Sequence, residues 1–146
     1  MTSAEIKPED FPSRTFDKLR FGDTDSVGHV NNAAFSTFYE TGRTHLVHAG
    51  DQKLLEPGFG FVLAHISIDY LGEILWPGQV DIASGTTRIG NSSVHFAQAL
   101  FQNGQCVSRA KSIIVLTDRS IRRSHPLPDA VRAFFEQRMI RSETLY

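Results

Sequence analysis

The chain has 146 residues, of which 40% are apolar and 21% are charged, and its formal net charge at pH 7 is -1. This balance predicts one globular domain and excludes a disordered polar chain or the broad positive field of a non-specific nucleic-acid binder. The single cysteine, Cys106, excludes an internal disulfide and a thiolate metal cage. No apolar run approaches the ~20 residues of a membrane span or forms an N-terminal signal peptide. We therefore expect a cytoplasmic protein that binds neither nucleic acid nor membrane.

The first 32 residues predict an arm, a strand and a loop. Residues 1–12 are polar, contain two prolines and are expected to form a loose arm. Imperfect alternation of apolar and polar residues over Arg14–Phe21 predicts a first strand. Residues 22–32 contain many Gly, Asp, Ser and Asn residues, which is typical of a loop.

A long helix is predicted from Ala33 onward, because apolar residues then recur three or four positions apart. Asn31 or Asn32 is a suitable N-cap, and Gly50 is suitable for the position just past the C-terminus. Gly42 lies on the apolar stripe, where its missing side chain allows the helix to approach a sheet closely.

The second half predicts four strands and a short helix. The expected strands are Phe59–Tyr70, Gln79–Ile89, Ser92–Gln102 and Gln105–Thr117. Asn103-Gly104 is the strongest hairpin signal, because both residues tolerate the positive φ angles of a tight turn. Pro126–Met139 predicts the C-terminal helix. One long helix and about five antiparallel strands are typical of an α+β domain with the helix on one sheet face.

The other sheet face has little left in the chain to cover it. Strict alternation along Phe59–Tyr70 places Phe61 and Leu63 on this uncovered face, and Phe101 is expected there too. A second copy of the chain is the simplest cover.

Asp25 precedes the predicted helix by a few residues. A carboxylate at this place can attack a carbonyl or activate water, and the free N–H groups of a helix start can polarise a carbonyl oxygen. Together these groups suffice in outline for acyl transfer.

Residues 20–32 read Arg-Phe-Gly-Asp-Thr-Asp-Ser-Val-Gly-His-Val-Asn-Asn, and Phe35, Phe38, Glu40 and Arg43 follow on the helix. This stretch resembles the signature of the 4-hydroxybenzoyl-CoA thioesterase family of hotdog-fold proteins. That signature reads Asp-x-Asp-x-x-Gly-His-Val-Asn-Asn-Ala, then an aromatic helix, then Glu-x-x-Arg. The resemblance continues at residues 68–71, 88–93 and 126–128.

The resemblance implies a hotdog fold, in which a curved antiparallel sheet wraps one long helix, as a single domain over 1–146. It implies hydrolysis of an acyl-CoA thioester to free acid and CoA, without metal or cofactor. Asp25 matches the catalytic carboxylate, as nucleophile or general base. Asn32 matches the position whose backbone N–H polarises the thioester carbonyl, although its side chain differs from those of the family.

Further residues are candidate substrate contacts, and three of them have a structural alternative. They are His29, Glu40, His65, Arg88, Ser92 and Ser93, the last three at a turn that the resemblance places near the CoA arm. His29 can instead fix the loop by a hydrogen bond, Glu40 can form a surface pair with Arg43, and His65 can be an interface residue. Arg119, Arg122 and Arg123 form a second basic cluster, which by default is a solvated loop. Its charges also suit the CoA phosphates, but the turn with Arg88 ranks higher because the resemblance places it near the CoA arm.

Three alternatives concern the loop and the function. Asp25 can simply brace its loop, as aspartates in glycine-containing loops do. Asp23-x-Asp25-x-x-Gly28 partly matches a calcium loop, but Ala34 stands where that loop needs Glu. The alternative function is a non-catalytic hotdog module that binds CoA or an acyl carrier. The aromatic helix suits an aryl or a medium-chain acyl group equally.

The resemblance also predicts assembly. We expect an obligate homodimer, doubled to a homotetramer, with Asp25 near the subunit boundary and the sheet continuing across a two-fold axis. The interface of such an obligate pair should exceed ~2,000 Å² in total.

Overall fold

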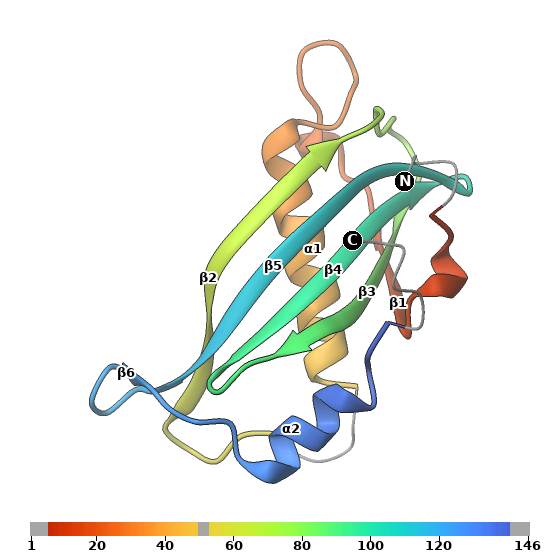
Figure 1. Ribbon diagram of the computed structural model, residues 1–146. Coiled ribbons are helices and arrows are strands. Elements are labelled where there is room, and N and C mark those ends of the chain that lie inside the picture. The colour runs from red at the N-terminus through yellow and green to blue at the C-terminus, as the bar shows by residue number, and fades with distance from the viewer. Residues whose placement is uncertain (1–5, 50–52, 141–146) are drawn as a thin grey trace.

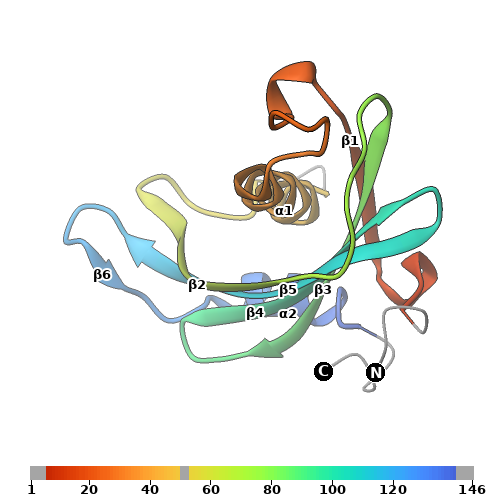
Figure 2. The same ribbon diagram turned by 90° about the horizontal axis from the view of Figure 1, so that it is seen from above.

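A curved antiparallel sheet wraps around one long helix in the computed structural model (Figure 1), which describes residues 6–49 and 53–140. In chain order the elements are η2 (Pro8–Asp10), β1 (Ser13–Lys18), η3 (Phe21–Asp23), α1 (Asn32–Val47), β2 (Phe59–Tyr70), β3 (Gln79–Ile89), β4 (Ser93–Gln102), β5 (Gln105–Asp118), β6 (Arg123–Ser124) and α2 (Asp129–Glu136). The strand order is β1-β3-β4-β5-β2, and the short β6 pairs with β5. Seen from above, α1 runs through the hollow of the sheet (Figure 2). This arrangement confirms the predicted α+β class.

Most predicted elements lie where the sequence placed them. β2 and β3 have the predicted bounds, and the Asn103-Gly104 turn adopts φ angles of 52° and 82°. β1 ends earlier than expected, because the chain turns into η3 at Phe21. α1 ends at Val47 with His48 as its C-cap, so the proposed role of Gly50 lies outside the described residues. α2 is shorter than predicted.

Local chemistry sets the start and the buried face of α1. The Asn31 side chain accepts a hydrogen bond from the Ala33 N–H at 2.9 Å, as an N-cap should. The helix buries Phe35, Phe38, Tyr39, Gly42, Arg43 and Leu46 against the sheet. Phe35, Phe38 and Tyr39 join Ile82 of β3 and Leu100 of β4 in one apolar cluster. This core fixes the height of α1 above the sheet.

A β-bulge in β2 corrects the predicted sheet faces. Leu63 pairs with Ile114 of β5, but His65 pairs with the adjacent Ile113, so Ala64 is an extra residue. The bulge shifts the alternation by one position. Phe61 and Leu63 therefore face α1, on the same side as Ile66, Ile68 and Tyr70. The prediction that Phe61 and Leu63 lie on the uncovered face was wrong.

The outer face of β3 and β4 is covered by the chain itself. Phe101 lies on this face, as predicted, but it is fully buried. Ile6 and Phe11 of the N-terminal segment pack over it, and Ile140 packs at the same cluster. Residues 6–12 are therefore a docked segment where a loose arm was expected, and no second copy is needed to bury Phe101.

Candidate active site

Asp25 lies on a small hairpin that leads into α1. The Asp25 N–H donates to the His29 carbonyl at 2.8 Å, and Thr24 forms an antiparallel bridge with Val30. The Asn31 N–H donates to the Asp23 carbonyl at 2.7 Å, which closes the hairpin at its base. Asp25 is thus held two residues from Asp23, whose carbonyl is hydrogen-bonded to the residue just before α1.

The Asp25 carboxylate is oriented by its own loop. Its Oδ1 atom accepts hydrogen bonds from the Val27 N–H at 2.9 Å and the His29 N–H at 3.2 Å. No group of the described residues donates to Oδ2. Asp25 is exposed, so Oδ2 faces solvent and is free to meet a substrate or a water molecule. The same two bonds brace the loop, so Asp25 can stabilise the loop through Oδ1 and still offer Oδ2 for catalysis.

The start of α1 supplies free donors beside this hairpin. Asn32 is the first helical residue, and its N–H has no acceptor within the described chain. Its side chain is exposed. The phenol of Tyr70, at the end of β2, donates to the Asn32 carbonyl at 3.4 Å, and the Tyr70 ring contacts that of Phe35. The end of β2 therefore lies beside the helix N-terminus.

The neighbouring charged residues shape the loop. Asp23 pairs with Arg20 and accepts the Arg20 N–H. Partial burial alone would raise the pKa of Asp23, but these hydrogen bonds hold it below its usual value. The His29 Nε2 atom lies 3.3 Å from Glu73. His29 thus fixes the loop through both its backbone and its ring.

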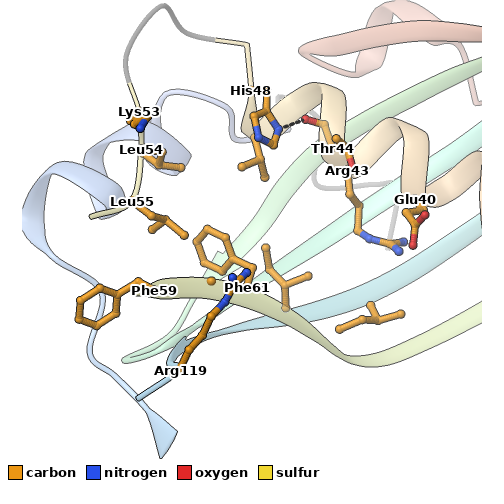
Figure 3. A pocket seen from close by; sticks show the side chains of 14 residues that line it. Glu40, Arg43, Thr44, His48, Lys53, Leu54, Leu55, Phe59, Phe61 and Arg119 are labelled. Carbon is orange, nitrogen blue, oxygen red and sulfur yellow. Dashed lines mark hydrogen bonds between the residues drawn. The ribbon is translucent and has the colours of Figure 1, made fainter. Parts of the chain in front are cut away.

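A cavity of about 690 Å³ lies at the other end of α1, between the helix, residues 53–55 and the start of β2. Figure 3 shows Glu40 and Arg43 at one end of it and residues 53–55 at the other. Its walls are apolar, including Val47, Leu55, Phe61, Leu63 and Ile114. The volume suits a small-molecule group.

Arg43 differs from its predicted role as one half of a surface pair. It is buried, with 8% of its surface exposed, and it lines the cavity. No carboxylate of the described residues, including Glu40, lies within 4 Å of its guanidinium. Burial lowers the pKa of Arg43, and the nearby Glu40 opposes that change. Apart from the position of Arg43 next to Gly42, no residue pattern indicated this burial.

The remaining predicted contacts do not converge on Asp25 within one copy of the chain. Glu40 lines the cavity. Arg88, Ser92 and Ser93 lie at the β3–β4 turn, which packs against the segment leading into α2 through the Leu127 N–H and the Asn91 carbonyl. This turn lies at the end of the molecule away from the start of α1 (Figure 1). His65 is exposed on the outer face of β2.

Sequence reasoning did not select several residues of the cavity. Thr44, His48, Lys53 and Arg119 all line it. His48 is the helix C-cap, and its ring nitrogen Nδ1 lies 2.8 Å from the Thr44 carbonyl. Arg119 was assigned to a solvated loop, and no residue pattern marked its approach to β2.

None of the helices in the described part of the chain has the length and hydrophobicity of a transmembrane helix.

Residues 19–135 match the sequence model of the thioesterase-like superfamily. The chain belongs to this superfamily. Acyl-CoA thioester hydrolase YbgC of Escherichia coli O6:H1 is 24% identical over 124 residues, which cover 82% of this chain and 92% of YbgC. This chain is thus a thioester hydrolase by family, and the resemblance drawn from residues 20–43 is confirmed.

Solved structures confirm the hotdog fold. A thioesterase of Thermus thermophilus, in complex with coenzyme A and Zn, is 32% identical with a TM-score of 0.76 and covers 88% of this chain and 95% of its own. The PA5185 protein of Pseudomonas aeruginosa PAO1 superposes with a TM-score of 0.83 at 24% identity, covering 94% and 98%. The second likeness shows the fold alone.

Proposed function

We propose that this thioesterase-superfamily member hydrolyses an aryl- or medium-chain acyl-CoA to the free acid and CoA, with Asp25 as nucleophile or general base. The observation that carries the proposal is the fixed Oδ1 of Asp25, which leaves Oδ2 free on the hairpin that opens α1. The similarity to YbgC and to the coenzyme A-bound Thermus protein supports CoA as the carrier.

Two routes fit this geometry. In the general-base route, Asp25 takes a proton from water while the water oxygen attacks the thioester carbon. In the nucleophile route, Oδ2 attacks, an anhydride forms as the C–S bond breaks, and water then hydrolyses the anhydride. In both routes the Asn32 N–H stabilises the carbonyl oxyanion, and CoA leaves as a thiolate that gains a proton. Neither route needs a metal or cofactor, so activity should survive treatment with EDTA.

A shared site follows if two copies pair through β2. Among the described strands, β2 pairs only with β5, so its other edge is free, and Val62, Leu63 and Tyr70 are nearly half exposed along it. A two-fold axis can pair this edge with itself only in antiparallel fashion. The cavity at the start of β2 then lies beside the end of the partner's β2, where Tyr70 contacts Asn32 and where the partner's Asp25 hairpin begins.

This dimer supports the remaining predicted contacts. It brings the Arg88, Ser92 and Ser93 turn of one copy to the same end as the partner's Asp25 hairpin, which suits contacts with the CoA arm. His29 then orients the loop around the thioester, Glu40 lies in the acyl cavity, and His65 lies close to the subunit boundary. Ile113 and Val115, half-buried on the outer face of β5, support the pairing of two dimers into a tetramer.

Asp25→Asn and Asp25→Ala together test the catalytic role. Asparagine keeps an Oδ1 acceptor for Val27 and His29 but removes the carboxylate, whereas alanine removes both. We expect both variants to lose at least ~100-fold in kcat on acyl-CoA substrates with a thiol-trapping dye, because the missing group acts in the transition state. Asp17→Asn, on β1, is the matched control and should retain wild-type turnover.

The loop-bracing bonds favour one other candidate function, a module that binds CoA or an acyl carrier without turnover. That function predicts binding with no thiol release from any thioester in the panel. A brace-only role of Asp25 predicts wild-type activity for Asp25→Asn and loss of activity for Asp25→Ala alone. Either result would contradict the proposed catalytic role.

A further inference from the structure

Arg43 is a buried cation with almost no partner in the described chain. Its one hydrogen bond runs from Nη1 to the Gln98 Oε1 atom at 3.4 Å, although a guanidinium carries five N–H donors. Gln98 is held in place because its amide nitrogen donates to the Tyr39 carbonyl at 3.0 Å and to Ser84 Oγ at 2.9 Å. A guanidinium this buried and this poorly paired is costly unless an anion joins it.

The cavity offers the place where such an anion can bind. Arg43 lies at the end of the cavity beside Glu40, away from residues 53–55 (Figure 3). Apolar side chains from α1, β2 and β5 form the walls between the two ends. An apolar chain that carries one terminal negative group therefore matches both the apolar walls and the guanidinium of Arg43.

The lining of the cavity carries a net positive charge, with Glu40 beside Arg43 and the other two cations toward the opposite end. Arg43, Lys53 and Arg119 contribute three permanent positive charges, and Glu40 is the only lining carboxylate among the described residues. Arg119 lies across β2 at Gly60, where a Cβ atom would come within 2.5 Å of the Arg119 Nη2 atom. Its guanidinium can occupy this place beside the cavity because residue 60 is a glycine. No carboxylate of the described chain pairs with it.

We propose that the acyl group hydrolysed by this protein carries a carboxylate at its far end, and that Arg43 binds that carboxylate. This inference rests on the proposed thioesterase function and names its substrate class. In the β2-paired dimer, the thioester lies near the partner's Asp25 hairpin, at the end of the cavity opposite Arg43. The acyl chain then runs along the apolar walls, and its terminal carboxylate forms charge-assisted hydrogen bonds with Arg43.

Matched substrate pairs test the proposal on the wild-type protein. Hexanoyl-CoA and adipoyl-CoA have equal chain length and differ in the terminal carboxylate, as do octanoyl-CoA and suberoyl-CoA. We expect kcat/KM to be at least ~10-fold higher for the dicarboxylic member of one pair or both, because a hydrogen-bonded ion pair discriminates by about this factor. The free dicarboxylic acid should also inhibit competitively at lower concentration than the monocarboxylic acid.

Variants then assign the preference to Arg43. Arg43→Gln should raise KM for the dicarboxylic substrate with little change in kcat, leave the neutral substrate nearly unaffected, and so abolish the preference. Arg43→Lys should restore part of it. Arg119→Gln is the comparison variant: it removes the cation beside Gly60, away from Arg43, so it should lower the preference for the dicarboxylic substrate much less than Arg43→Gln does.

The failures are distinguishable. Equal or better hydrolysis of the neutral members of both pairs overturns the inference and leaves the thioesterase function standing. Release of no thiol from any CoA ester overturns the proposed function and the inference with it. A preference that survives in folded Arg43→Gln, as judged by circular dichroism, overturns the role of Arg43. If that variant does not fold, the wild-type ratios and the inhibition by free acids still decide the substrate class.

Discussion

Gly42 of α1 lies directly against Ile82 of β3: a Cβ atom on the glycine would come within 2.6 Å of the Ile82 Cγ2 atom. The same Cβ atom would lie 2.7 Å from Gln98 Nε2 and 2.8 Å from Ser84 Oγ. All three neighbours are buried, and Gln98 also holds Arg43 in place. The position of α1, its packing on β3 and the placement of Arg43 therefore all depend on the absence of a side chain at Gly42.

Gly42→Ala should destabilise the protein by about 2 kcal/mol. Alanine improves helix propensity by ~1 kcal/mol, but overpacking against three fixed neighbours costs more. Urea unfolding followed by circular dichroism gives the difference in the free energy of unfolding.

Gly60→Ala is the matched control for this prediction. A Cβ atom there also makes a contact below 3 Å, but only with the end of the flexible, exposed Arg119 side chain, which can move away. Its effect should stay below ~0.5 kcal/mol. Equal stability of the two variants would show that α1 can shift away from β3.

Tyr39 should make stability fall at alkaline pH. The ring is fully buried, and its hydroxyl donates to Ser108 Oγ at 2.6 Å. Burial raises the pKa of Tyr39 far above its usual value of ~10, and the bond with Ser108 only partly opposes this. Above pH 10 the unfolded chain loses this proton and the folded chain keeps it, so the free energy of unfolding decreases by about 1.4 kcal/mol per pH unit.

Urea unfolding between pH 9 and 11 measures this dependence. Tyr39→Phe should have a shallower decrease above pH 10 than the wild type, because no phenol is left to titrate. Ser108→Ala, which removes the hydrogen-bond partner but keeps the phenol, should lower stability while retaining the steep decrease. Identical pH slopes for the wild type and Tyr39→Phe would contradict the assignment.

Val62→Asp should weaken the dimer. Val62 lies on the outer face of β2 with 48% of its surface exposed, and pairing through this edge would bring two new carboxylates close together. We expect light scattering to give two or four times 16.3 kDa for the wild type and a shift toward 16.3 kDa for the variant. Activity should fall in parallel, since each site needs both copies.

Ile121→Asp is the control for the dimer. Ile121 is an even more exposed apolar residue, but it lies in the turn between β5 and β6, and β6 pairs with the edge of β5 opposite β2. This variant should keep the wild-type mass. A fully active wild-type particle of 16.3 kDa would refute both the shared site and the edge pairing.

Local sequence signals were sufficient to predict the helices and strands, but not on which side of the sheet every side chain lies. The bounds of β2, the Asn103-Gly104 turn and the Asn31 cap depend on residues close in sequence, and all three were predicted. The facing of Phe61 depends on a bulge that no local pattern marks, because Ala64 is compatible with either phase.

The candidate site also combines residues that local sequence predicts with residues that only tertiary packing places. Asp25 was found from its sequence context, because the whole hairpin lies within a dozen residues. The burial of Arg43 depends on Gln98, 55 positions away, and the cavity depends on four separate segments. Residue spacing on a helix predicts an exposed pair at positions 40 and 43, and only tertiary packing changes that outcome.

The extra residue in β2 has a consequence for how this strand can evolve. Ala64 is exposed, so most side chains at this position should be tolerated. Deleting the residue is different, because it would restore strict alternation and turn one half of the strand over relative to the other. Phe61 and Leu63 would leave the cavity wall, or Ile66 and Ile68 would leave the core. Residue 64 can thus be substituted but not deleted. Insertions and deletions among descendants of this chain should therefore avoid the middle of β2.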